Sequence, residues 1–518
     1  MTLKTFVKQK LYNTEIRNHL YLDKIVRINN ILEDKNPHNI SMTDGKCQES
    51  PAVTSYKRDM AIEKILDDGN YSFHKSLLIV NPFNASLLSA VLIFNTETEC
   101  KTSYTIIGRK GSANYTKCDE NITTRHRLPI LGLYENCINR VEINLLDEKN
   151  NILDTTYICI KTPKLKAPMH GCVKLTKSID QLAADFIIAS GGYTCGVYAF
   201  DPQGNIRFAL SRIPQYYGIH LFDDGKFLFP ELNQRRPAYG NAHSVVIQEM
   251  DMLGRVHHTY LHEKGFHHWA IEKKPGGNIL TLTSSMKDTY MENAIVEIDR
   301  EKSSNVMIFT VDEKNGTFRQ EKIFPTPLSV TRSNSVYNHN TGRLMAMCAN
   351  LNPPVDNYKA KIYEFDYSTG NCINEFSFKE KFFSAHPFDF NIQSMANPLV
   401  NTKLFLGHLY EAHRENSLPP ELKNPQKRIN SCLLLKMRVM GYILQIQAKD
   451  HDLEKIYVYN DKNVYVQDFT DTEQPLPLFK TQKYFMSMSL NKMEPGRYKV
   501  AVRYLGKTYK MSDKLNIS

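Results

Sequence analysis

The segment Ile247-Gln248-Glu249-Met250-Asp251-Met252-Leu253-Gly254 decides the fold, because its order of residues recurs along the chain. An apolar, strand-like run ends at an aspartate, and a turn that often contains glycine follows. The same order returns at 197–204, 295–299 and 362–370, so that successive aspartates are 50, 48 and 67 residues apart. The complementary pattern, a turn followed by an apolar strand, occurs at 224–229, 276–282, 341–347 and 402–406.

This repeat predicts a β-propeller. A period of about 45–50 residues with several strands in each unit is typical of that fold. The repeat covers about 270 residues, which corresponds to five or six blades. The Asp-x-x-Gly sequences match ordinary hairpin turns, so we interpret them as structural rather than functional.

The hydrophobic pattern divides the chain into four regions, which together predict a mainly β protein. Helix spacing of apolar residues occurs within 10–35 and again at 57–66. Short β-rich runs separated by Asn, Gly, Asp and Pro follow and predict a sandwich. The four expected regions are a helical N-terminal segment at 1–70, an N-terminal β-sandwich at 71–165, the β-propeller at 170–437 and a small C-terminal β-domain at 438–518.

Composition is that of an ordinary globular protein. The chain has 518 residues, of which 42% are hydrophobic and 23% charged, and its formal net charge is +10. This charge fits either a solvated surface or attraction to anionic substrates. No long block of Lys and Arg is present, so a nucleic-acid partner is not expected.

Motifs for several other classes of protein are missing. The chain has no Cys-x-x-Cys pair, no His-Glu-x-x-His, no glycine-rich phosphate loop and no nucleotide-binding fingerprint. We therefore expect no metal and no cofactor. The first residues show no secretory signal, and no apolar run reaches the length of a transmembrane helix. The ten cysteines are expected to be reduced thiols, and the expected location is the cytoplasm.

Three segments together resemble the bacterial PAPS-independent aryl-sulfate sulfotransferases. Val80-Asn81-Pro82-Phe83-Asn84-Ala85-Ser86-Leu87-Leu88-Ser89-Ala90 is similar to the entry into that family's N-terminal sandwich. Leu128-Pro129-Ile130-Leu131-Gly132-Leu133-Tyr134 resembles a motif near the end of the sandwich. The stretch from Glu249 to Asn278, with Gly265-Phe266-His267-His268-Trp269 inside it, resembles the blade of the first catalytic histidine. The resemblance covers about residues 75–435, so we treat the chain as a divergent member.

The resemblance implies a six-bladed propeller whose funnel holds the catalytic side chains. In the family, a histidine takes the sulfuryl group from an aryl sulfate as a covalent intermediate. His386, in Ser384-Ala385-His386-Pro387-Phe388-Asp389-Phe390, corresponds to this nucleophile, and His268 to the first of the other histidines. Asn334 and Ser335 retain the family's residues and are expected to bind substrate. His267, on the face of its strand opposite to His268, would support substrate binding.

Two expected site residues depart from the family pattern. Arg332 stands where a second histidine is expected, and Asn350 stands where an arginine is expected. We hypothesise that the positive charge has been relocated to Arg332, because a guanidinium forms a bidentate fork for sulfate or phosphate. The alternative is that Arg332 is an arginine at the propeller rim and that the site is inactive. Asp389 and Glu411 are candidates for orienting His386.

The leading hypothesis is therefore a nucleotide-independent group transfer that uses His386, His268, Arg332 and Asn350. An aryl sulfate or a related anionic donor would supply the group, and a phenol or glycan hydroxyl would receive it. The second hypothesis is a propeller without catalysis that binds a glycan or an anionic partner. A third is a scaffold that works through the propeller rim. Assembly into a homo-oligomer and a periplasmic location, as in family members with a signal, stay open.

Overall fold

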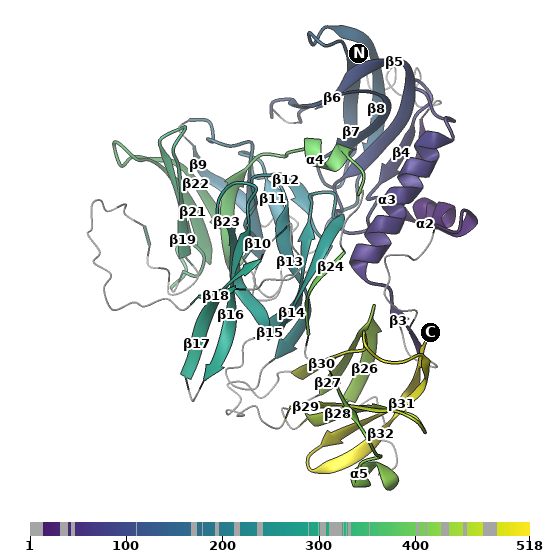
Figure 1. The fold of residues 1–518 in the computed structure, drawn as a ribbon. Helices are drawn as coiled ribbons and strands as arrows, with labels where there is room; N and C mark the ends of the chain where they lie inside the picture. Colours follow the sequence, from purple (N-terminus) through teal and green to yellow (C-terminus); the bar gives the residue numbers. More distant parts are fainter. Residues whose placement is uncertain are drawn as a thin grey trace.

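The computed structural model describes most of the chain. The described residues are 14–31, 40–42, 47–109, 111–166, 173–178, 180–191, 196–211, 218–235, 242–287, 290–298, 300, 307–309, 324, 326–327, 329, 333–351, 353–399, 404–409, 412–425, 435–448, 453–469 and 484–518. The protein is mainly β, as expected. Figure 1 shows the N-terminal sheet and the C-terminal β-domain at different ends of the molecule, with the repeat region between them.

The N-terminal β-domain is one curled sheet in the order β1-β4-β5-β7-β8, with β6 also paired to β5. The long strand β5 runs through the middle of this sheet. Its register shifts between Asn95 and Cys100, and this bulge lets the strand bend from one neighbour to the next. The strands are β1 (Glu15–Asn18), β4 (Leu77–Val80), β5 (Ala90–Ile106), β6 (Tyr115–Ile130), β7 (Ile138–Leu146) and β8 (Ile152–Lys161).

The N-terminal segment is helical only in part. Helix α2 (His19–Ile28) begins where the side chain of Asn18 accepts a hydrogen bond from the backbone N–H of Leu20, and helix α3 (Pro51–Asp67) begins with proline. Two short strands between them, β2 (Ile40–Met42) and β3 (Cys47–Gln48), join the sheets of the C-terminal domain. The segment thus connects both ends of the molecule.

The repeat region forms three sheets from its described residues. Their orders are β12-β11-β10-β23, β13-β14-β15-β16-β17-β18 with β24 beside β15, and β19-β20-β21-β22-β9. The first strand of the region, β9, pairs with β22, and β23 pairs with β10, so distant parts of the chain close onto each other. The described residues make three sheets rather than six, and closure into six blades therefore stays a prediction.

The strands of this region have the following bounds: β9 (Val173–Ser178), β10 (Phe186–Gly191), β11 (Val197–Phe200), β12 (Ile206–Ala209), β13 (Phe227–Arg235), β14 (Ala242–Met250), β15 (Val256–Glu272), β16 (Ile279–Lys287), β17 (Tyr290–Ile298), β18 (Met307–Phe309), β19 (Ser333–Asn338), β20 (Arg343–Cys348), β21 (Ala360–Asp366), β22 (Cys372–Phe378), β23 (Phe382–Phe388) and β24 (Phe405–His408). A short helix, α4 (Gln393–Ala396), follows β23.

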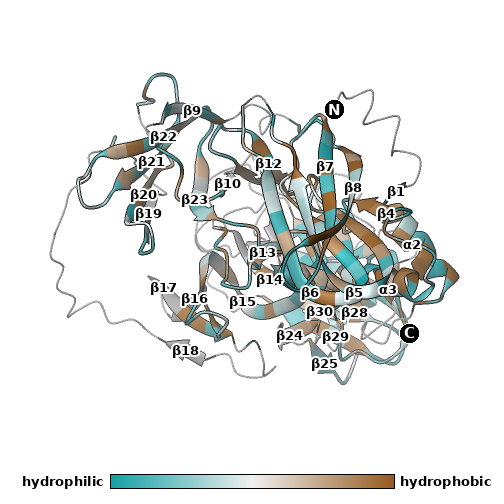
Figure 2. Cartoon of the chain, turned by 90° about the horizontal axis from the view of Figure 1, so that it is seen from above, coloured by the Kyte–Doolittle hydropathy of each residue, from teal (hydrophilic) through white to brown (hydrophobic). Residues whose placement is uncertain are grey.

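The C-terminal domain has two sheets, β2-β32-β31-β28-β29-β25 and β3-β26-β27-β30. It has its own apolar cluster, whereas the main core runs continuously from α3 through the N-terminal sheet into the repeat region. Figure 2 shows the matching hydrophobic stretches along β4, β5 and α3. The elements are β25 (His413–Glu415), α5 (Pro420–Lys423), β26 (Leu435–Met440), β27 (Ile443–Ala448), β28 (Leu453–Tyr459), β29 (Val464–Asp468), β30 (Tyr484–Ser489), β31 (Gly496–Tyr504) and β32 (Lys507–Ile517).

Candidate functional site

The pairing of β23 with β10 places His386 inside the protein. His386 lies opposite Ile188, and two residues earlier Ser384 lies opposite Ser190. Side chains two apart on a strand share a face. The hydroxyls of Ser190 and Ser384 are 2.8 Å apart, and His386 is 7% exposed. The strand therefore presents a serine and a histidine side by side on a buried face.

The rings of His220, Trp269 and His386, which come from three separate segments, lie against one another. The centroid of the His220 ring is 5.3 Å from that of His386, and the centroid of the Trp269 ring is 5.5 Å from it. The rings of His220 and Trp269 are 6.4 Å apart. All three pairs meet edge to face, which is a favourable arrangement for aromatic rings. We call His220, Trp269 and His386 the three-ring cluster.

The segment that carries His220 is tied to both of the other segments. The backbone N–H of Gly218 donates to the carbonyl of His268 over 2.6 Å, and the N–H of Ile219 donates to Oγ of Ser384 over 3.2 Å. A Cβ at position 218 would lie only 3.2 Å from the His268 carbonyl oxygen and 3.5 Å from the Trp269 ring. Glycine at 218 thus permits the close approach that forms the cluster.

His268 itself occupies a strained position on β15. Its φ is +62°, in the left-handed region, which costs a non-glycine residue about 1–3 kcal/mol. The pairing of β15 with β16 shifts between His267 and Ala270, so the alternation expected for His267 and His268 on a regular strand is broken here. As a result, the neighbouring Trp269 provides the ring that contacts His386.

Burial keeps the histidines of the cluster neutral. Burial, together with the nearby His220, lowers the pKa of His386 to about 3, and burial also lowers the pKa of His220. The Nε2 atom of His386 is buried and has no hydrogen-bond partner among the described residues. In the neutral tautomer that carries its proton on Nδ1, the Nε2 atom has a lone pair available for attack on an electrophile.

The other predicted site residues are not all visible in this arrangement. Arg332 lies outside the described residues, and so does Glu411. The backbones of Asn334 and His267 are described, but their side chains are not. Ser335 is exposed on β19 opposite Ala346.

Asn350 and Asp389 lie near the ends of strands. Asn350 follows β20, and its N–H donates to Oγ of Ser329 over 3.1 Å. Strands β19 and β20 both contact β23, so these residues belong to the neighbouring sheet. Asp389 makes another contact: its Oδ1 accepts a hydrogen bond from the N–H of Asp185 over 2.8 Å, and the orienting role expected of Asp389 stays a prediction.

The sequence analysis missed two of the three rings. Trp269 is the only tryptophan in the chain and directly follows His267 and His268, which is a signal that could have been used. His220 stands in Gly218-Ile219-His220-Leu221, which matches no motif. Only the folded chain brings His220 to His386.

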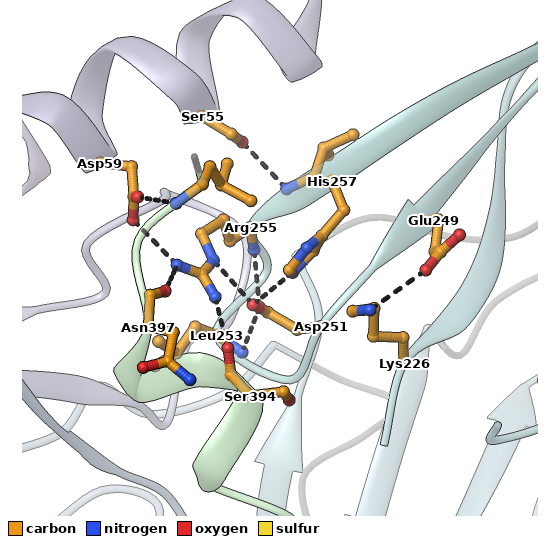
Figure 3. Close-up of polar contacts among 12 residues, drawn as sticks. Ser55, Asp59, Lys226, Glu249, Asp251, Leu253, Arg255, His257, Ser394 and Asn397 are labelled. Atoms are coloured by element: carbon orange, nitrogen blue, oxygen red, sulfur yellow. Dashed lines mark hydrogen bonds and ion pairs between the residues drawn. The ribbon is translucent and has the colours of Figure 1, made fainter. Parts of the chain in front are cut away.

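A buried charge network, shown in Figure 3, anchors the strands of the site to α3. Arg255, at the turn before β15, is fully buried and bonds Asp59 of α3 and Asp251, both at 2.9 Å. It also donates to the carbonyls of Ser394 and Asn397, on the segment that follows β23. Arg255 thereby links the beginning of the Trp269 strand to the continuation of the His386 strand.

The ion pairs of this network strongly favour the charged carboxylates. The guanidinium of Arg255 and the ring of His257 outweigh burial and lower the pKa of Asp251 to about 2. Arg127 and Arg255 likewise lower the pKa of Asp59, which is itself fully buried. Such a network is costly to break, since removal of one member leaves an unpaired charge inside the protein.

The fold and the site define a mainly β protein in which an N-terminal β-domain packs on a repeat region with a buried histidine cluster. Two family models match it. The arylsulfotransferase Ig-like domain matches residues 77–163, and the arylsulfotransferase (ASST) domain matches residues 173–307. Residues 77–163 and 173–307 thus match the two domains of the arylsulfotransferase family, as the motifs had suggested. The match to the arylsulfotransferase domain supports a sulfotransferase-like enzyme.

Other comparisons add little. No curated protein matches the chain. A protein of unknown function from Bacteroides caccae is 9% identical, with 55% of this chain and 97% of that chain covered and a TM-score of 0.19. Cobalt-substituted apocarotenoid oxygenase from Synechocystis is 8% identical, with 90% and 97% covered and a TM-score of 0.14. Similarity at these TM-scores supports no conclusion.

Two general features complete the description. The seven cysteines among the described residues are all free thiols, some of them exposed and some buried. No helix in the described part of the chain is long and apolar enough to cross a membrane.

Proposed function

We propose that this protein transfers a sulfuryl group from an aryl sulfate to a hydroxyl acceptor, without a nucleotide, through a covalent intermediate on His386. The observation that carries the proposal is the state of His386: a buried, neutral imidazole whose Nε2 lacks a hydrogen-bond partner among the described residues. Family membership supplies the aryl sulfate as donor class and a hydroxyl as acceptor class.

The first half-reaction forms one bond and breaks one. The Nε2 lone pair of His386 attacks the sulfur of the aryl sulfate, an N–S bond forms, and the S–O bond to the aryl group breaks. The phenolate leaves with the electron pair and takes up a proton from solvent. A neutral histidine is required, because a protonated ring has no lone pair to offer.

The second half-reaction reverses the attack. The acceptor oxygen attacks the sulfur, the N–S bond breaks, and its electron pair returns to Nε2. The acceptor hydroxyl loses its proton in this step. His220, whose neutral ring is 5.3 Å from that of His386, is our candidate for accepting the proton.

In this proposal, the remaining predicted residues bind the anionic sulfuryl group, its donor or its acceptor. Arg332 would neutralise charge on the sulfuryl oxygens, and Asn350, Asn334, Ser335 and the histidines at 267 and 268 would donate hydrogen bonds to donor or acceptor. Closure of the three sheets into a six-bladed propeller with a central funnel is part of the same proposal.

Release of a coloured phenol tests the proposal. The full-length protein is mixed with 4-nitrophenyl sulfate and phenol, and nitrophenol release is compared between the wild type and His386→Ala. The matched control is His74→Ala, which changes an exposed histidine on the N-terminal domain. We expect turnover in the wild type and the control and none in His386→Ala, with a sulfated His386 peptide in quenched wild-type samples.

The same assay addresses the alternative of a propeller that binds a glycan or an anionic partner without catalysis. Equal rates for the wild type and His386→Ala would contradict the histidine intermediate. No turnover with aryl sulfates or other anionic donors, together with retained ligand binding, would favour the binding protein.

A further inference from the structure

A second cavity lies where the N-terminal β-domain meets the first sheet of the repeat region. Its volume is about 580 Å³, in the range of small-molecule sites. Its walls are residues 112–115 before and at the start of β6, the connection from β9 to β10, and the turn between β11 and β12. None of the three-ring cluster lines it, so the cavity is separate from the proposed transfer site.

Tyr115, on one wall, has a hydroxyl that lacks a partner. The residue is 8% exposed, and its hydroxyl is buried without a hydrogen-bond partner among the described residues. The ring is held firmly: its centroid is 5.0 Å from that of Phe186, and a Cβ at Gly132 would lie 3.0 Å from its edge. A buried hydroxyl left unpaired costs about 1–3 kcal/mol, so this fixed group favours a ligand that accepts its hydrogen.

Arg207, which lines the same cavity, likewise has a buried polar atom without a hydrogen-bond partner among the described residues. Its Nε donates to the carbonyl of Gly132 over 2.6 Å, its Nη1 donates to Asp201 over 2.9 Å, and its guanidinium stacks 3.8 Å from the ring centre of Tyr134. The remaining nitrogen, Nη2, is buried and has no partner among the described residues. The family motif around Gly132 thus holds both Tyr115 and Arg207 in place.

The charges around the cavity are balanced. Each of its three carboxylates has a cationic partner, so the site offers no large excess charge to attract an ion. Polar side chains such as Asn114 and Gln203 add further hydrogen-bonding groups. The pairs are Asp180 with Arg343 at 2.9 Å, Asp185 with Lys117 at 3.3 Å and Asp201 with Arg207 at 2.9 Å.

We propose that this cavity binds a neutral, hydroxyl-rich ligand, namely one or two sugar residues of a glycan. Sugar hydroxyls accept hydrogen bonds from the Tyr115 hydroxyl and from Nη2 of Arg207, and they donate to the carboxylate of Asp185, which can accept several hydrogen bonds. The inference does not depend on the transfer reaction. It assigns an accessory site that would retain a glycan on the protein.

Isothermal titration of the full-length protein with maltotriose, cellotriose and chitotriose tests this site. We expect at least one of these sugars to bind the wild type and His386→Ala equally. Tyr115→Phe keeps the ring but removes the hydroxyl, and should weaken binding about 3- to 10-fold. Asp185→Asn should weaken it by a similar factor, because the amide replaces a charged acceptor.

The control is Tyr157→Phe, on β8 and away from the lining of this cavity, which should bind as the wild type does. Thermal unfolding of each variant shows whether the fold is retained. Failure of all three sugars to bind would overturn the proposal, and so would unchanged affinity in both Tyr115→Phe and Asp185→Asn. Binding of inorganic sulfate that Tyr115→Phe weakens would overturn the assignment of a neutral ligand.

Discussion

The ring of Trp269 stands almost perpendicular to the ring of His386, at an interplanar angle of 86° and a centroid distance of 5.5 Å. This contact joins β15 to β23, two strands more than 100 residues apart in the sequence. Together with His220, Trp269 excludes water from the histidine that we propose as the nucleophile. The protonation state of His386 is therefore set by tertiary packing.

Replacement of Trp269 should raise the pKa of His386. In Trp269→Ala, water reaches the imidazole, the desolvation cost falls, and the pKa should move from about 3 toward the ordinary value of about 6.5. NMR titration of the histidine signals measures this change. Trp269→Phe retains an aromatic ring and should show a smaller rise. An unchanged pKa in Trp269→Ala would mean that other groups exclude the water.

Loss of Arg255 should strongly destabilise the protein. Arg255→Ala leaves the buried carboxylates of Asp59 and Asp251 without this partner, and removal of one member of a buried pair costs about 3–5 kcal/mol. Urea unfolding measures the difference. Lys64→Ala is the control. It breaks an exposed ion pair between Lys64 of α3 and Asp68 at the end of that helix, for which a loss of about 0–1 kcal/mol is expected. Equal effects of the two substitutions would rule out a special role for the network.

The stability contributed by Asp251 and His386 should rise with pH from about 2 to about 6.5. The pKa of Asp251 is about 2 in the folded protein, below its unfolded value of about 3.9, so its contribution is lost as the pH falls through this interval. His386 stays neutral when folded, with a pKa of about 3, whereas the unfolded histidine takes up a proton below about 6.5. Both groups therefore bind fewer protons in the folded state.

Thermal unfolding across this pH range measures the sum over all titrating groups, and His386→Gln isolates the contribution of His386. The variant should lose the part of the pH dependence between about 3 and 6.5. The same low pKa of His386 predicts that nitrophenol release by the wild type does not fall between about pH 8 and 5, because His386 stays neutral over that range. A steep decline of wild-type activity centred near pH 6.5 would contradict this prediction.

Arg332 should affect anion binding if the positive charge has moved there. Arg332→Ala removes a charge-assisted donor and should weaken sulfate binding and turnover about 10- to 100-fold. Arg332→His restores the residue of the family pattern and should recover part of the activity when combined with Asn350→Arg. Sulfate affinity that is the same in the wild type, Arg332→Ala and Arg332→His would show that the charge was not relocated.

Local patterns allowed the β-rich class and the family to be predicted. The motif around Gly132 is one example. Gly132 adopts a φ of +85°, and its carbonyl accepts a hydrogen bond from Arg207. His386 was predicted as a site residue from its surrounding segment, and it does lie in a buried cluster. The strands β2 and β3, by contrast, are too short to produce a pattern, so their pairing with the C-terminal domain could not be predicted.

The sequence by itself determined the kinds of element and the resemblance to the family, because these depend on residues that are close together in the chain. The tertiary structure alone decided which rings surround His386, which carboxylates surround Arg255 and which polar groups line the second cavity. These partners come from segments far apart in the sequence, and burial, which shifts their pKa values and leaves hydrogen-bonding groups unpaired, arises only when those segments pack together.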